Sequence, residues 1–79
     1  MRVTLYTKER CGLCEQAADA LRRAQKLIHF ETEVVYIEDD PALCSRYHDR
    51  VPVIVVGDKE VTSALVEEAR LLAVLSSLA

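Results

Sequence analysis

The stretch Cys11-Gly12-Leu13-Cys14 lies between a short apolar run, Val3-Thr4-Leu5-Tyr6, and a segment of helical periodicity from Glu15 to about Ile28. This arrangement predicts a strand, a loop and a helix, with both cysteines at the first turn of the helix. There the unpaired N–H groups and the positive end of the helix dipole favour a thiolate. A pair of reactive thiols is therefore the first hypothesis for the chemistry of this chain.

Size and composition limit the alternatives. The chain has 79 residues, of which 51% are hydrophobic and 29% charged, so we expect one globular domain spanning residues 1–79. No run approaches the roughly 20 apolar residues that cross a bilayer. A net charge of −3 and only four aromatic residues speak against nucleic acid and anionic membranes as partners. The early polar residues do not fit a signal peptide, and we expect a cytoplasmic protein.

The number of cysteines leaves two kinds of site open. Three cysteines cannot form a closed set of disulfides, and in a reducing compartment a Cys-x-x-Cys pair is more often catalytic or metal-binding than structural. Cys11, Cys14, Cys44 and His48 have spacings that suit a zinc site. An iron–sulfur cluster shared between two chains is a further metal alternative. The apolar strands, however, offer this domain a core without metal.

The remaining pattern predicts an α/β fold with the order βαβαββα. We expect strands at residues 2–6, 33–37, 53–56 and 60–62, with a turn at Gly57-Asp58-Lys59 that makes an antiparallel hairpin. A short helix from Pro41 to about Tyr47 has Asp40 as its N-cap. Helices should cover both faces of a four-stranded mixed sheet.

Two helices carry most of the apolar pattern. The apolar positions of the first are Ala17, Ala18, Leu21, Ala24, Leu27 and Ile28. Ser63 is the expected cap of the last helix, with Val66 and Glu67 in its first turns. One face of that helix should contain Leu65, Ala69, Leu72, Ala73 and Ser76, with Leu71, Val74, Leu75 and Leu78 beside it.

Two motifs together resemble a known family. Tyr6-Thr7-Lys8 leading to the cysteine pair, and Val51-Pro52 opening a hydrophobic strand, resemble glutaredoxins and their short glutaredoxin-like relatives in the thioredoxin-fold superfamily. The resemblance covers essentially the whole chain. It implies the minimal thioredoxin fold, with strand order 2-1-3-4, and thiol–disulfide oxidoreductase activity.

The resemblance also implies roles for individual residues. Cys11 would attack a substrate disulfide, and Cys14 would resolve the mixed disulfide. Lys8 stands at the position that favours the thiolate and meets a substrate carboxylate, with Arg10 as a second nearby cation. Val51-Pro52 matches a cis-proline site whose preceding backbone pairs with an extended substrate.

The chain departs from the glutaredoxin pattern at three places. Gly12-Leu13 replaces the Pro-Tyr often found between the cysteines, and Arg50 stands where a threonine is common. Thr62-Ser63-Ala64-Leu65 replaces the Gly-Gly and following acids that cap the amino end of glutathione. These departures speak against glutathione as the partner, although it is kept as a candidate co-substrate. The fold and disulfide chemistry carry over better than the identity of the substrate.

We accordingly expect a monomeric thiol–disulfide oxidoreductase without a bound metal or other cofactor. Its substrates would be protein or small-molecule disulfides, with glutathione or a reductase as electron donor. The alternatives are a metal-binding module and a non-catalytic thioredoxin-fold adaptor. Cys44 is interpreted as a small hydrophobic residue of its helix or as a third redox thiol. Arg46 and Arg50 are candidates for contact with an anionic substrate.

Overall fold

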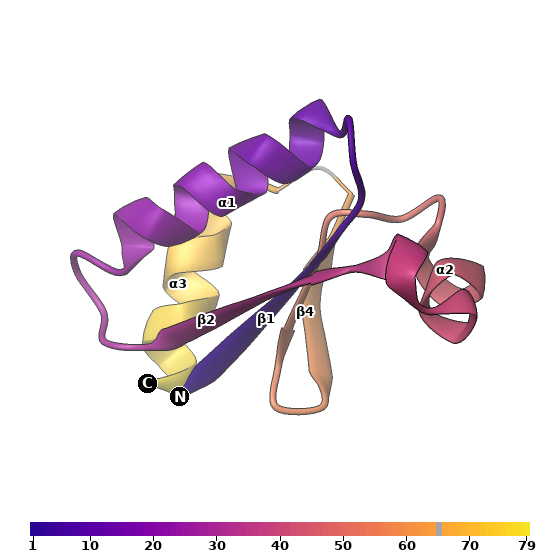
Figure 1. Cartoon of the computed structure of the whole chain (residues 1–79). Helices are drawn as coiled ribbons and strands as arrows, with labels where there is room; N and C mark the ends of the chain where they lie inside the picture. Colours follow the sequence, from indigo (N-terminus) through magenta and orange to yellow (C-terminus); the bar gives the residue numbers. More distant parts are fainter. Residues whose placement is uncertain (65) are drawn as a thin grey trace.

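The fold is built from the elements that the hydrophobic pattern predicts, in the predicted order (Figure 1). The computed structural model describes residues 1–64 and 66–79. Its elements are β1 (Arg2–Thr7), α1 (Gly12–Ala24), β2 (Glu31–Tyr36), the 3-10 turn η1 (Ile37–Asp39), α2 (Pro41–Tyr47), β3 (Val53–Val56), β4 (Lys59–Ser63) and α3 (Glu68–Leu78). Among these described elements, no helix has the length and apolar character needed to cross a membrane.

The four strands form one mixed sheet in the order β2-β1-β3-β4, which confirms the predicted order 2-1-3-4. Central strand β1 is parallel to β2 and antiparallel to β3, and β3 and β4 form the predicted antiparallel hairpin. In this register Leu5 lies opposite Val34 on one side and Ile54 on the other. The carboxyl end of β1 leads directly into the loop that carries the first cysteine.

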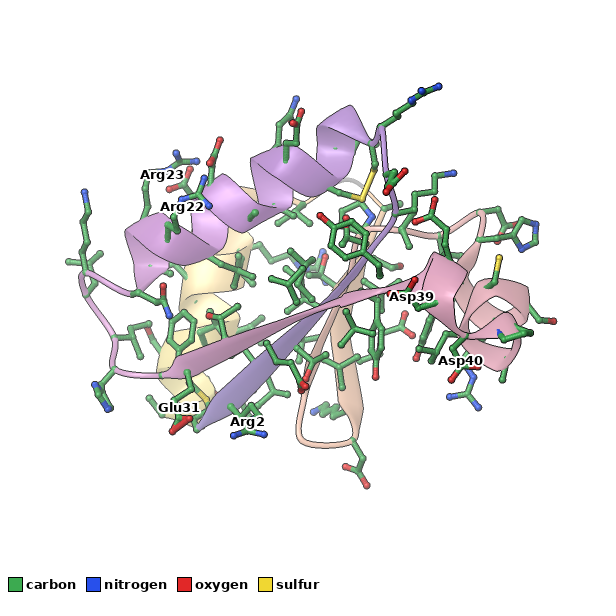
Figure 2. All side chains as sticks on the ribbon, viewed as in Figure 1. Arg2, Arg22, Arg23, Glu31, Asp39 and Asp40 are labelled. Carbon is green, nitrogen blue, oxygen red and sulfur yellow. A yellow bond between two sulfur atoms is a disulfide. The ribbon has the colours of Figure 1, made fainter. Side chains whose placement is uncertain are left out.

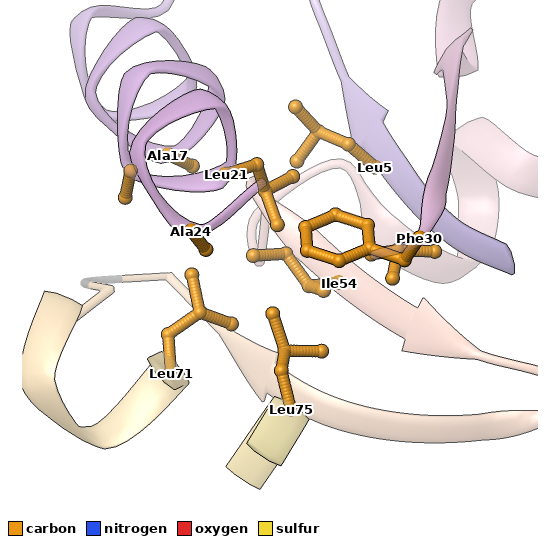
Figure 3. Close-up of a cluster of buried hydrophobic side chains, with 10 residues drawn as sticks. Leu5, Ala17, Leu21, Ala24, Phe30, Ile54, Leu71 and Leu75 are labelled. Carbon is orange, nitrogen blue, oxygen red and sulfur yellow. The ribbon is translucent and has the colours of Figure 1, made fainter. Parts of the chain in front are cut away.

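One face of the sheet packs against α1 and α3, as Figure 3 shows. The first core cluster consists of buried side chains from β1, α1, β3 and α3 together with Phe30: Val3, Leu5, Ala17, Ala20, Leu21, Ala24, Phe30, Ile54, Leu71 and Leu75. Small alanines on α1 let that helix approach the sheet closely. This cluster is the scaffold of the domain.

The opposite face of the sheet supports a second core cluster, made of Cys14, Ile37, Tyr47, Val51, Val53 and Val55. Its residues come from β3, from α2 and η1, and from the first turn of α1. Strand β3 supplies both clusters because successive side chains along a strand point to opposite faces. Helices thus cover both faces, as predicted, and the second cluster contains one of the two paired cysteines.

Helix α1 ends earlier than its hydrophobic pattern predicts. It stops at Ala24 instead of about Ile28, and Leu27, which we predicted on its apolar face, is 73% exposed. After Ala24 the backbone tightens, since the N–H of Leu27 bonds to the carbonyl three residues before it. The side chain of Gln25 donates hydrogen bonds to the carbonyl of Phe30 and the hydroxyl of Thr32, which directs the chain back toward β2.

The start and the buried face of the last helix also differ from the prediction. Ser63 is the final residue of β4, and α3 begins only at Glu68, with Glu67 as an N-cap that makes no side-chain bond. Leu71 and Leu75, predicted to flank the buried face, are its buried residues. Because this helix is apolar around much of its circumference, its sequence pattern does not identify which face is buried. The predicted position of Leu65 lies outside the described residues.

Candidate active site

The cysteine pair lies at the N-terminal end of α1, where Figure 2 shows it as a disulfide. Cys11 is the N-cap of the helix, in an extended backbone conformation, and Cys14 lies in the first turn. The backbone N–H of Cys14 donates a hydrogen bond to the sulfur of Cys11 at 3.1 Å. The sulfur of Cys11 therefore takes the place of the side-chain oxygen that usually satisfies a free N–H group at a helix start.

The two sulfurs differ in access. Cys14 is 3% exposed and belongs to the second core cluster, whereas Cys11 is partly exposed and packs against that cluster from outside. Gly12 is exposed, and a side chain added to it would meet nothing within 4 Å. Leu13 is 42% exposed. The Cys11 side of the pair is thus open to an incoming molecule, and the Cys14 side is closed by the core.

The loop before the cysteines is held by contacts with η1 and with the residue at the end of α2. The ammonium group of Lys8 donates a hydrogen bond of 3.4 Å to the carbonyl of His48, at the end of α2. The N–H of Glu9 donates to a carboxylate oxygen of Glu38 at 3.0 Å. Arg10 is exposed and adopts a left-handed backbone conformation with φ of 56°. The two predicted cations, Lys8 and Arg10, therefore lie in the same loop as Cys11.

The second motif, Val51-Pro52, contains the cis peptide bond that the resemblance implies. Val51 shares the second core cluster with Cys14, so residues far apart in the sequence meet beside the cysteine pair. The N–H of Val51 donates to the carbonyl of Tyr47 at 3.2 Å. On either side of Val51, the carbonyls of Arg50 and Pro52 both accept the N–H of Ala64 at 2.9 Å.

An aromatic stack that the sequence did not reveal supports this region. The rings of Tyr6 and Tyr47 lie 4.8 Å apart with 27° between their planes, and Tyr47 is buried in the second cluster. The guanidinium groups of Arg46 and Arg50 lie 5.8 Å and 5.3 Å from the centre of the Tyr47 ring. Arg50 also forms a two-pronged ion pair with Glu60 on β4, at 2.9 Å and 3.2 Å. Only the spacing of the tyrosines was visible in the sequence, and it does not predict a stack.

The proposed four-ligand metal site is not assembled. In the part of the chain that the structure describes, no three His, Cys, Asp or Glu side chains are grouped to hold a metal ion. Cys44 is a partly exposed free cysteine on α2, and the exposed His48 follows that helix. Cys44 does not belong to the cluster around Cys14. The spacing of these residues therefore does not correspond to a common site.

Two features lie away from the cysteine pair. A cavity of about 380 Å³ separates β4 from α3, and neither cysteine lines it. Arg23 on α1 forms a two-pronged ion pair with Glu68 on α3, at 2.6 Å and 2.9 Å. The hydrogen bond from Arg23 lowers the pKa of the Glu68 carboxyl below its usual value. This pair joins two helices on the scaffold face of the sheet.

Comparison with known proteins agrees with the fold. The family model described as "Glutaredoxin-like domain (DUF836)" matches residues 2–76. The chain belongs to this glutaredoxin-like family. A search among curated proteins finds no match. The glutaredoxin-like domain shares its thioredoxin-like fold with solved thioredoxins and glutaredoxins.

Three solved structures illustrate the similarity. Target protein XcR50 from X. campestris is 38% identical, with 95% of this chain and 96% of that chain covered and a TM-score of 0.77. Protein Ne2328 from Nitrosomonas europaea is 37% identical over 94% and 89% of the two chains, with a TM-score of 0.79. The glutaredoxin from Archaeoglobus fulgidus is 26% identical over 87% and 79%, with a TM-score of 0.56. These comparisons confirm the predicted family and fold.

Proposed function

We propose that this glutaredoxin-like domain is a thiol–disulfide oxidoreductase that cycles Cys11 and Cys14 between dithiol and disulfide. One observation carries the proposal. The partly exposed sulfur of Cys11 accepts the N–H of Cys14 at the start of a helix, while the sulfur of Cys14 is buried behind it. A hydrogen bond to sulfur and the positive end of a helix both favour a thiolate, which is the form that attacks disulfides.

The reaction begins with the reduced pair. The Cys11 thiolate attacks one sulfur of a substrate disulfide, so that a Cys11–substrate disulfide forms and one substrate thiolate leaves and takes a proton. The thiol of Cys14 then loses its proton and attacks the sulfur of Cys11. The mixed disulfide breaks, the second substrate thiol is released, and the Cys11–Cys14 disulfide remains. Two electrons and two protons have passed from the dithiol to the substrate.

The surroundings of Cys11 support this division of roles. Lys8 and Arg10 supply positive charge in the loop before Cys11, where it favours the thiolate and the approach of a substrate carboxylate. The Val51-Pro52 segment supplies backbone groups for an extended substrate. Exposed Leu13 offers an apolar contact between the cysteines. Protein disulfides or small-molecule disulfides are the proposed substrates, and the reducing cytoplasm is the proposed location.

A thiol reductant must return the disulfide to the dithiol. We propose either glutathione, through two successive exchanges that produce glutathione disulfide, or a dithiol reductase. The two donors can be distinguished by measuring multiple-turnover reduction of a substrate disulfide. Each assay contains either glutathione or a thioredoxin-reductase-type enzyme as the sole reductant. Turnover with glutathione would identify it as the co-substrate. Turnover only with the dithiol donor would exclude it.

Cysteine substitutions test the proposed roles. In a Cys44→Ser background, Cys11→Ser should abolish reduction of Ellman's reagent and of insulin. Cys14→Ser should instead trap a mixed disulfide through Cys11, visible as an added mass on the intact protein. The Cys44→Ser protein itself should retain full activity. Equal residual activity in the Cys11 and Cys14 variants would contradict the assignment, and an inactive dithiol would favour the adaptor function.

A further inference from the structure

Arg50 is the point at which three parts of the site meet. Its guanidinium group forms the two-pronged ion pair with Glu60 of β4 and lies 5.3 Å from the ring centre of Tyr47. Its backbone N–H donates to the carbonyl of Tyr47 at 2.8 Å, and its carbonyl accepts the N–H of Ala64 at 2.9 Å. One residue thus joins the end of α2, strand β4 and the segment after β4 immediately before Val51-Pro52.

The backbone groups around Val51 differ in how many hydrogen bonds they make. The N–H of Val51 is already donated to Tyr47, and the carbonyls of Arg50 and Pro52 share the N–H of Ala64. Between these two carbonyls, the carbonyl of Val51 accepts no hydrogen bond from the described residues. It belongs to a residue that packs in the same cluster as Cys14. Such a carbonyl can accept a hydrogen bond from a backbone N–H of an extended polypeptide.

We propose that Arg50 is a positioning residue that holds the Val51 carbonyl ready for the backbone of an extended polypeptide disulfide. This inference rests on the proposed oxidoreductase function and adds a preference for peptide over non-peptide disulfides. Arg50 acts through its neighbours. Its two-pronged ion pair with Glu60 and its contact with the Tyr47 ring fix the orientation of the backbone before Pro52. A non-peptide disulfide such as Ellman's reagent has no main chain to place against Val51 and gains nothing from this arrangement.

The geometry of the ion pair explains why an arginine is needed. A guanidinium group offers parallel donors to both oxygens of a carboxylate and at the same time a flat face to an aromatic ring, whereas a lysine ammonium is a point charge. The side chains of Arg50 and Glu60 are 41% and 35% exposed. Exposed ion pairs usually contribute little to stability, but a bidentate arginine–carboxylate pair fixes the relative orientation of the two groups. Orientation of the adjacent backbone is the effect that the pair can supply.

The chain contains a matched control for this pair. Arg23 and Glu68 form a second two-pronged ion pair that also joins two elements, but on the scaffold face of the sheet. Arg50→Ala, Arg50→Lys and Glu60→Gln should therefore be compared with Arg23→Ala. Each reduced protein is mixed with excess insulin or Ellman's reagent in single-turnover experiments, which need no electron donor. Amide hydrogen exchange of Val51 and Ala64 is measured on the same proteins.

The expected result is a change of substrate preference. Arg50→Ala should slow the reaction with insulin about tenfold, the loss expected for one hydrogen bond to substrate, and leave Ellman's reagent within about twofold. Arg50→Lys and Glu60→Gln should give smaller losses in the same direction, and the Val51 and Ala64 amides should exchange faster. Arg23→Ala should leave both substrates and both amides unchanged.

Two outcomes would overturn the inference. Equal losses with insulin and Ellman's reagent, in proportion to a loss of folded protein, would reduce Arg50 to a structural role. Unchanged amide exchange together with an unchanged insulin rate in folded Arg50→Lys and Glu60→Gln would show that the ion pair does not position this segment. A wild-type dithiol that reacts with neither substrate would reject the proposed oxidoreductase function instead, and amide exchange alone would then decide whether Arg50 orders this segment.

Discussion

The N–H of Cys14 donates to the sulfur of Cys11 across 3.1 Å, so the residue buried in the core stabilises the sulfur that faces outward. This relationship predicts unequal reactivity in the reduced protein. In a Cys44→Ser background, iodoacetamide should alkylate Cys11 about tenfold faster than Cys14 at neutral pH, because the thiolate is the nucleophile. Mass mapping of the labelled cysteines gives both rates. Equal rates would show that helix position and solvent access do not make the two thiols differ in reactivity.

Tyr47 should be essential to stability through its ring and not through its hydroxyl. The ring is buried and stacked on Tyr6, and the hydroxyl makes no hydrogen bond with the described residues. Tyr47→Ala should lower the free energy of unfolding by about 3–5 kcal/mol. Tyr47→Phe keeps the stack and should change it by less than about 0.5 kcal/mol. Urea unfolding of the oxidised proteins measures both values. A large loss in the phenylalanine variant would point to a partner for the hydroxyl.

Two leucines near the end of α1 offer a direct test of its boundary. Leu21 is 1% exposed, whereas Leu27 is 73% exposed beyond the helix end. Leu21→Ala should lower the free energy of unfolding by about 2–5 kcal/mol. Leu27→Ala should change it by no more than about 0.5 kcal/mol. Thermal and denaturant unfolding of both variants provide the comparison. Similar losses would mean that the helix continues to Ile28, as its hydrophobic pattern predicted.

The ion pair between Arg23 and Glu68 predicts a pH dependence. The hydrogen bond from Arg23 lowers the pKa of Glu68 in the folded protein. The stabilisation is therefore fully present above the unfolded pKa of Glu68 and is lost as pH falls through its folded value. Carboxyl carbon shifts measured by NMR should show the Glu68 pKa rising in Arg23→Gln. Arg22→Gln, which removes a pair with Asp19 instead, should leave it unchanged.

The order of helices and strands was predictable because the local sequence signals agreed with one another. The apolar run before Cys11, the helical period after it, the Asp40–Pro41 start of α2 and the buried run at Val53–Val56 all appear as predicted. Helix ends were less predictable. The turn after Ala24 depends on a side-chain contact from Gln25 to Thr32, residues that no periodicity connects.

The site was predictable in its cysteines and its proline but not in its supports. Short motifs identify chemistry that adjacent residues perform, whereas the Arg50–Glu60 pair and the Tyr6–Tyr47 stack join residues from separate elements. The segment after β4 shows a third limit. Ala64 adopts a left-handed backbone with φ of 58°, a conformation that favours glycine, near the point where the resemblance implies Gly-Gly. The replacement of glycine was visible in the sequence, but the left-handed backbone of Ala64 was not.

The division of the core by the sheet has a consequence for how such a domain can change. Strand β3 presents Ile54 to the scaffold cluster and Val53 and Val55 to the cluster beside the cysteines. A replacement at Ile54 or at Leu71 and Leu75 of α3 changes the scaffold face, whereas one at Val53 or Val55 changes the cluster that contains Cys14. Substitutions at these β3 and α3 scaffold positions can therefore change the thermal stability of the domain without replacing a side chain that packs against Cys14.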